Sequence, residues 1–239
     1  MAGHSKWKNI QKRKNAQDSK RGKIFQKLSR EIYVAAKQGP DPEMNPALRL
    51  ALDKAKSANM PNDNIERAIK RASDTQDGAN YAEIVYEGYG PGGIGVLAYC
   101  LTDNVNRTAT NVRVAFNHNG GSLGEKGSVA FQFERKGYIA IDRQGLEDDD
   151  DTLMMAVLEA GADDLELSDE VAEIYTQATE FAAVRDALSQ TYELAQAELT
   201  MVPNVTVPLA EDQIADFEKM LEAIEDDDDV TDVYHNADY

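Results

Sequence analysis

The chain has 239 residues, of which 42% are hydrophobic and 28% are charged, with a formal net charge of −18. This is the composition of a folded globular protein rather than of a disordered chain. A single cysteine, Cys100, excludes an internal disulfide and fits a reducing compartment. No run approaches the roughly 20 apolar residues of a membrane helix, and no apolar run follows the basic N-terminus as in a secretory signal. We therefore expect a cytoplasmic protein without a membrane partner.

The charge is divided unevenly along the chain. Residues 1–73 hold 17 Lys/Arg and 7 Asp/Glu, whereas residues 74–239 hold 8 and 36. The first thirty residues are the most basic stretch, with ten Lys or Arg against one acid. A concentrated positive field on an acidic body indicates a polyanionic partner, and nucleic acid is the first candidate. The acidic remainder argues against the whole surface lying along a duplex.

The basic part is predicted to form a small helical domain, residues 1–78. Residues 1–17 lack helical periodicity and are predicted to form a basic arm. From Asp18, apolar residues recur at helical spacing up to Ala36, so that the basic side chains fall on the opposite, outward face. That apolar face consists of Ile24, Phe25, Leu28, Ile32, Ala35 and Ala36.

Two further helices are predicted in the basic part. Asn45-Pro46 is a cap followed by a first-turn proline, and Pro61-Asn62-Asp63 opens the next helix. Asp63 and Glu66 have the spacing of a capping box.

Beyond a polar linker at 73–80 the hydrophobic period changes. Residues 83–87 and 94–101 predict two strands joined by GYGPGG, 104–117 a helix, and 129–133 a third strand. Residues 138–201 follow the order βαββαβ of a ferredoxin-like domain. A helix at 211–224 and a strand at 230–234 end the chain and are available to complete the earlier segment.

These elements predict an α+β, multidomain fold. A small N-terminal helical domain, 1–78, is followed by two α/β, ferredoxin-like domains, one inserted in the other. Residues 135–203 are predicted to form the inserted βαββαβ domain. Residues 79–134 are predicted to form the other domain, completed by 204–239.

The glycine-rich loop at 88–93 satisfies the dinucleotide pattern G-x-G-x-x-G. A dinucleotide site needs a helix directly after the glycines, and here strand residues follow. A hairpin loop is the better interpretation, although exposed glycines and flanking tyrosines allow a backbone or base to approach closely. The candidate contact residues are Tyr86, Gly88, Tyr89, Gly90, Gly92 and Gly93.

The remaining motifs do not indicate catalysis or a metal site. Ser122 lies in a G-x-S-x-G match, but a helix precedes it and a turn follows, so it is predicted to be a turn residue. The acidic runs 147–151 and 225–229 are interpreted as solvated caps and turns, with bound Mg²⁺ as the alternative. The three histidines lie far apart and form no ligand pattern with one cysteine. We expect no cofactor, no metal, no small-molecule substrate and no enzymatic activity.

The basic arm and the first helix are the candidate nucleic-acid interface. A solvated lysine face is the competing interpretation, but the density and unbroken sign of the cluster favour nucleic acid. The one tryptophan of the arm can stack on a base for about 1–3 kcal/mol. The candidate residues are Lys6, Trp7, Lys8, Lys12, Arg13, Lys14, Lys20, Arg21, Lys23, Lys27 and Arg30.

Several motifs of the chain resemble those of the YebC/PmpR family of probable transcriptional regulators. They are MAGHSKW at 1–7, KRGK at 20–23, YEGYGPGG at 86–93, NVNRT at 104–108, GSV at 127–129, and the Asp226–Asp229 run followed by VYHN at 233–236. The chain departs from the family at 38–42, where one glycine stands in place of two or three. The resemblance implies three domains, DNA binding through the basic N-terminal domain, a cytoplasmic location and no enzymatic activity.

The same resemblance implies an alternative function. A mitochondrial branch of the family resembles a translational activator of cytochrome c oxidase, and bacterial members are linked to ribosomes stalled on proline-rich stretches. The second expectation is therefore a ribosome-associated translation factor that binds ribosomal RNA. The predicted basic helix face is almost all Lys and Arg, which suits phosphates rather than base edges, so the sequence leaves DNA and RNA open.

Overall fold

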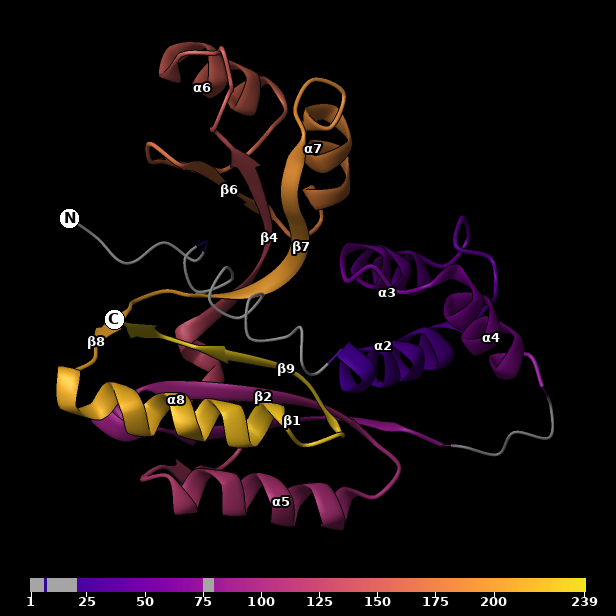
Figure 1. Cartoon of the computed structure of the whole chain (residues 1–239), viewed down its shortest axis with the longest axis vertical. Helices are drawn as coiled ribbons and strands as arrows, with labels where there is room; N and C mark the ends of the chain where they lie inside the picture. Colours follow the sequence, from indigo (N-terminus) through magenta and orange to yellow (C-terminus); the bar gives the residue numbers. More distant parts are fainter. Residues whose placement is uncertain (1–6, 8–20, 75–79) are drawn as a thin grey trace. The chain divides into compact units, whose positions relative to one another are not determined.

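The computed structural model describes residue 7, residues 21–74 and residues 80–239 (Figure 1). These described residues divide into two compact units, one within 21–132 with 205–239, the other of residues 133–204 with Trp7. Helices and mainly antiparallel sheets confirm the predicted α+β, multidomain class. The predicted domain boundaries stay a prediction. Most of the predicted basic arm lies outside the described residues.

Three helices follow one another in the basic region: α2 (Arg21–Ala36), α3 (Pro46–Ser57) and α4 (Asn62–Ala72). The predicted apolar face of α2 is confirmed, because Leu28 and Ile32 are buried in a core shared by all three helices. Asn45 caps α3 as predicted, since its side chain accepts a hydrogen bond from Leu48 N at 3.1 Å. The predicted capping box at the start of α4 is wrong: the helix begins one residue before Asp63, and no side chain caps it.

The first sheet has the strand order β3-β1-β2-β9, and all its pairs are antiparallel. Its strands are β1 (Ala82–Tyr89), β2 (Gly95–Thr102), β3 (Ser122–Leu123) and β9 (Val230–His235). Two helices, α5 (Val105–His118) and α8 (Glu211–Glu225), pack on one face of it (Figure 1). The 3₁₀ turn η2 (Pro91–Gly93) joins β1 to β2, and β8 (Val207–Pro208) pairs with β10 (Ala237–Asp238). The last long strand thus joins the sheet beside β2.

Two expectations between residues 120 and 133 are wrong. Ser122 lies in β3 and pairs with Tyr89, so it is a strand residue rather than a turn residue. The strand predicted at 129–133 is instead the 3₁₀ turn η3 (Ala130–Gln132), and β4 begins after it. The physical reason is that the N–H groups of Val129 and Ala130 donate to the Glu87 carboxylate instead of joining a ladder.

Residues 133–204 form the predicted βαββαβ order. The elements are β4 (Phe133–Asp142), α6 (Asp150–Glu159), β5 (Asp164–Leu167), β6 (Val171–Gln177), α7 (Phe181–Leu188) and β7 (Leu194–Pro203). The sheet order β5-β6-β4-β7 is that of a ferredoxin-like fold. Leu153 and Val157 of α6 and Phe181 of α7 are buried.

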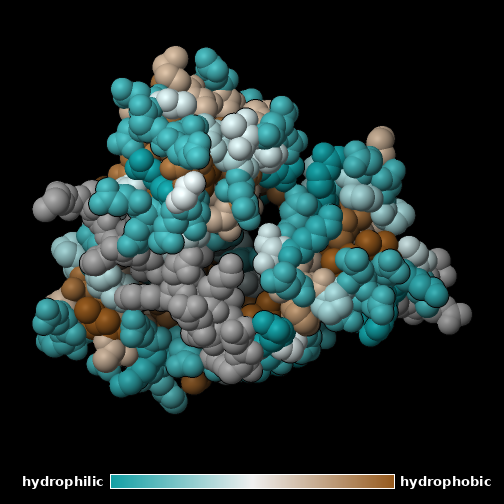
Figure 2. All heavy atoms as spheres, turned by 45° about the horizontal axis from the view of Figure 1, so that its top comes forward, coloured by the Kyte–Doolittle hydropathy of each residue, from teal (hydrophilic) through white to brown (hydrophobic). Residues whose placement is uncertain are grey.

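The face of the molecule drawn in Figure 2 is mainly polar. Hydrophilic residues dominate the face shown in Figure 2, and hydrophobic atoms appear there in small separate areas. Across the described ranges, no helix is long and apolar enough to cross a membrane.

Candidate functional site

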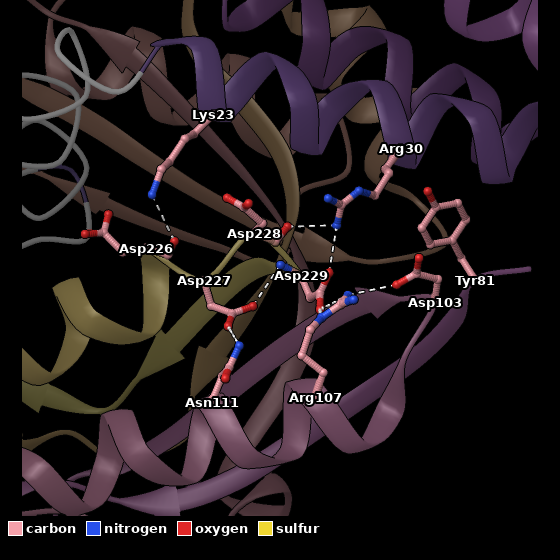
Figure 3. A pocket seen from close by; sticks show the side chains of 10 residues that line it. All are labelled: Lys23, Arg30, Tyr81, Asp103, Arg107, Asn111, Asp226, Asp227, Asp228 and Asp229. Atoms are coloured by element: carbon pink, nitrogen blue, oxygen red, sulfur yellow. Dashed lines mark hydrogen bonds and ion pairs between the residues drawn. The ribbon is translucent and has the colours of Figure 1, made fainter. Parts of the chain in front are cut away.

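A cavity of about 530 Å³ opens where α2, α5 and the turn after α8 meet. We call residues 225–229, which are the last residue of α8 and this turn, the acidic segment. Charged and polar side chains point into the cavity from α2 on one side and α5 on the other (Figure 3). The lining residues are Lys23, Arg30, Tyr81, Asp103, Arg107, Asn111, Asp226, Asp227, Asp228 and Asp229.

Asp229 is the centre of this cavity wall. Its side chain is only 4% exposed, and Arg30 and Arg107 approach it from opposite sides (Figure 3). Arg30 Nη1 lies 3.0 Å from Oδ1, and Arg107 Nη2 lies 2.6 Å from Oδ2. The hydroxyls of Thr102 and Thr108 also donate to Oδ2, at 3.1 and 2.8 Å. The carboxylate is therefore fully engaged by donors from α2, β2 and α5.

These donors set the charge of Asp229. Burial alone would raise the pKa of this carboxyl, but the hydrogen bonds from Arg107, Thr108 and Thr102 outweigh burial and hold the pKa below its ordinary value. Asp229 is thus ionised at neutral pH. The expectation that the run 225–229 is a solvated turn is wrong at this residue.

The basic face of α2 lies against the acidic segment. Lys27 Nζ donates to the Glu225 carbonyl at 2.6 Å, and Lys23 Nζ donates to the Asp226 carbonyl at 3.2 Å. Arg30 Nη1 donates to the main-chain carbonyl of Asp228 at 2.9 Å. Two of these acceptors close the C-terminus of α8, where the helix dipole favours cations. Three of the predicted phosphate-binding residues therefore already have an anionic neighbour within the chain.

A second ionic cluster attaches the helical region to β9. Lys54 Nζ lies 3.0 Å from a Glu31 carboxylate oxygen and 2.9 Å from an Asp232 oxygen. Burial alone would lower the pKa of Lys54, but the two carboxylates raise it above its ordinary value. Burial in turn raises the pKa of Glu31. Lys54 is thus a partly exposed cation that links the helical region to β9 through two carboxylates.

The glycine-rich loop differs from the expectation of exposed glycines at two positions. Gly88 and Gly90 are buried, because helices α5 and α8 pack directly on them. A Cβ atom at Gly88 would lie 2.5 Å from the ring of Phe116, and one at Gly90 would lie 2.7 Å from Met220 Cε. Only Gly92 and Gly93 in this loop are exposed, both with positive φ. The predicted contact role stays a prediction for these two glycines and for Tyr86 and Tyr89, whose hydroxyls donate to the Val105 and Ser128 carbonyls.

Glu87 is a buried carboxylate that the sequence did not indicate. It accepts hydrogen bonds from the N–H groups of Gly127, Val129 and Ala130 at 2.7–2.8 Å. Burial alone would raise its pKa, but the three donors together hold the pKa below its ordinary value. Glu87 therefore fixes the turn that precedes η3.

Replacing Glu87 with Gln is expected to remove a pH-dependent part of the stability. Because the folded pKa is below the unfolded value of 4.5, the carboxylate stabilises the fold above that pH. This contribution is lost as the pH falls through the folded pKa. Urea unfolding between about pH 7 and pH 3 should show a smaller loss of stability in Glu87→Gln than in the wild type. Parallel pH profiles of the two proteins would contradict this role.

Comparison with known proteins places the chain in a family. Residues 5–75 match the model of the TACO1/YebC protein N-terminal domain, and residues 81–237 match that of the TACO1/YebC second and third domain. The chain belongs to the TACO1/YebC family. A probable transcriptional regulatory protein of Enterococcus faecalis is 64% identical over 239 residues, and one of Listeria innocua is 62% identical over 238, each covering 99% of both chains.

A solved structure shows the same fold as this chain. The crystal structure of the conserved hypothetical protein Aq1575 from Aquifex aeolicus matches with a TM-score of 0.80 and 42% identity. The match covers 92% of this chain and 91% of that one. These findings confirm the resemblance drawn from the sequence motifs, and the names of the relatives indicate a regulatory protein.

Several motifs that carry the TACO1/YebC resemblance contact segments that are distant in the sequence. NVNRT at 104–108 contributes two donors to the last aspartate of the acidic segment. YEGYGPGG at 86–93 contributes the carboxylate that binds GSV at 127–129. Asn236 of VYHN accepts a hydrogen bond from Gly95 N at 2.8 Å. Such pairing joins segments that are distant in sequence, and no single motif indicates its partner.

The predicted nucleic-acid-binding residues fall partly within and partly outside the described residues. Lys6, Lys8, Lys12, Arg13, Lys14 and Lys20 lie outside the described residues. The Trp7 side chain is half-buried against the cluster that contains Tyr138 and Tyr175, and its main-chain N–H donates to Glu173 Oε1 at 2.8 Å. Arg21 and Lys23 are exposed. Within residues 7, 21–74 and 80–239, no group of three His, Cys, Asp or Glu could hold a metal ion.

Proposed function

We propose that this TACO1/YebC protein is a non-enzymatic regulator of gene expression that binds nucleic acid through its basic N-terminal region. The observation that carries the proposal is the set of exposed cations on one small helical region. Within residues 21–74 these cations are Arg21, Lys23, Lys37, Lys56, Arg67, Lys70 and Arg71. The names of the relatives, probable transcriptional regulatory proteins, support the regulatory role.

Helix α4 adds a basic group that the sequence argument did not include. Arg67, Lys70 and Arg71 are spaced on one exposed face of α4, while Ile65 and Ala68 face the core. Arginine and lysine side chains bind phosphate oxygens, and such contacts carry no sequence information directly. They suit phosphate contacts in DNA and RNA alike.

A non-enzymatic role is supported by the chemistry of the cavity. Its most buried carboxylate, Asp229, is already engaged by two arginines and two threonine hydroxyls. A general acid or base needs a proton to exchange near the working pH, whereas this pKa is lowered and the group is held in one state. The contacts of Asp229 therefore support a structural role for this carboxylate rather than a role as a general acid or base.

Ribosomal RNA is the second candidate target, with DNA the first. The observation that favours RNA is the acidity of residues 133–204, which hold four Lys/Arg against eighteen Asp/Glu. The phosphates of a duplex lying along the chain would be repelled by that unit. A particle of RNA and protein also presents protein surfaces, which the acidic unit can face instead.

Reversing the charges on α4 tests the proposed interface. We expect Arg67→Glu, Lys70→Glu and Arg71→Glu together to weaken nucleic-acid binding at least about tenfold. The slope of log affinity against log salt should also fall by about 2.7 for duplex DNA, because three phosphate contacts are lost. The measurement is fluorescence anisotropy with labelled duplex DNA and with a ribosomal RNA fragment, between about 50 and 200 mM salt.

The matched control reverses three exposed cations elsewhere: Arg113→Glu, Lys126→Glu and Lys219→Glu. It changes the net charge equally and should leave most of the affinity in place. An equal loss in both variants would show a general charge effect and would contradict the proposed interface. Tighter binding to the RNA fragment than to DNA would select the translational alternative.

A further inference from the structure

Helix α6 presents an apolar face away from its own core. Met154 is 43% exposed, and Met155 and Leu158 are each 58% exposed. Leu153 and Val157, on the opposite side of the helix, are at most 1% exposed, so the inward face is already packed. Successive residues of a helix are turned by about 100°, which places the three exposed side chains on one stripe. We call Met154, Met155 and Leu158 the α6 outer face.

The surroundings of the α6 outer face are strongly acidic. Residues 142–170 hold twelve Asp or Glu and one cation, Arg143, and eleven of the twelve acids are exposed. Arg143 is paired with Asp150 at the start of the helix. Asp151 lies one turn before Met155 and Glu159 one turn after it, so carboxylates close both ends of the stripe. Pale brown atoms bordered by hydrophilic ones lie over α6, at the top of Figure 2.

We propose that the α6 outer face docks a basic amphipathic helix of a partner protein. Two methionines and a leucine offer a deformable apolar contact for the apolar side of such a helix. The acidic rim would attract and orient the lysines and arginines on its flanks. Nucleic acid and anionic membranes would be repelled, and so would a second copy of the same acidic face. The proposed partner site is therefore separate from the basic region that is proposed to bind nucleic acid.

The test uses the full chain and a labelled synthetic helix with leucines on one face and lysines on the other. We expect the wild-type chain to bind it, and Met154→Ser, Met155→Ser and Leu158→Ser together to weaken binding about tenfold or more. The matched control replaces two exposed valines of α5, Val105→Ser and Val114→Ser, which are 46% and 45% exposed. This control should bind the peptide as the wild type does. Circular dichroism checks that both variants are folded.

Several outcomes would overturn the proposal. They are no binding by the wild type, equal binding by the α6 variant, or equal binding of a peptide with its lysines replaced by glutamates. A wild-type dimer that the α6 variant abolishes would assign the face to a second copy instead. Nucleic-acid binding should be unchanged in the α6 variant, so failure of this proposal and failure of the nucleic-acid proposal give different results.

Discussion

Replacing Asp226 and Asp228 with Asn is expected to strengthen nucleic-acid binding about tenfold, which is about 1.4 kcal/mol. The two carboxylates lie in the acidic segment that contacts Lys23, Lys27 and Arg30, and they repel any phosphate approaching these cations. The cations donate to main-chain carbonyls at 225, 226 and 228, which asparagine retains. The substitution therefore removes charge and leaves these three main-chain hydrogen bonds in place.

The measurement is again anisotropy with labelled nucleic acid, and the gain should shrink as salt screens the removed charges. The matched control is Asp212→Asn with Glu218→Gln, two exposed acids of α8 away from the segment. Equal gains in both variants would show that only the net charge matters. Unchanged affinity in the segment variant would show that the acidic segment does not oppose binding.

Asp229→Asn is expected to have the largest effect on stability, a loss of about 3 kcal/mol. The asparagine would be neutral beside Arg30 and Arg107. Its NH₂ group is a donor and would face N–H or O–H groups that now donate to the Asp229 carboxylate. The pKa of Asp229 is below its ordinary value of 3.8, so the carboxylate stabilises the fold above that pH and ceases to do so as the pH falls through the folded pKa.

Urea unfolding at neutral pH measures this loss, and Asp228→Asn is the control. Asp228 belongs to the same run, but its hydrogen bond from Arg30 goes to the main-chain oxygen, so its substitution should change stability by no more than about 0.5 kcal/mol. Equal stabilities of the two variants would contradict the central position of Asp229.

Much of the fold follows from local patterns in the chain. The apolar stripe of α2 repeats at the helical period, and its members Leu28 and Ile32 are buried where that period places them. The order βαββαβ at 133–204 leads to the sheet order β5-β6-β4-β7. Such patterns can be recognised in a sequence because the position of a residue in the local repeat fixes the face of the helix or strand on which it lies.

The errors arise where a distant group competes with the local pattern. Residues 129–133 have strand-like composition, yet their N–H groups turn toward Glu87, some forty positions earlier. Gly88 and Gly90 look like exposed loop glycines, yet Phe116 and Met220 pack where their side chains would be. Residue types are known from the sequence, whereas the burial of a residue depends on which distant segment of the chain packs against it in the folded structure.

The sequence by itself determined the uneven charge, the apolar face of α2, the order βαββαβ at 133–204 and the motifs that indicate the family. It did not determine the partners of its charges. Only the tertiary structure decided that Lys23, Lys27 and Arg30 lie against the acidic segment, about two hundred residues away. The physical reason is that ionic contacts depend on distance in space, and folding brought the most basic helix onto one of the most acidic turns.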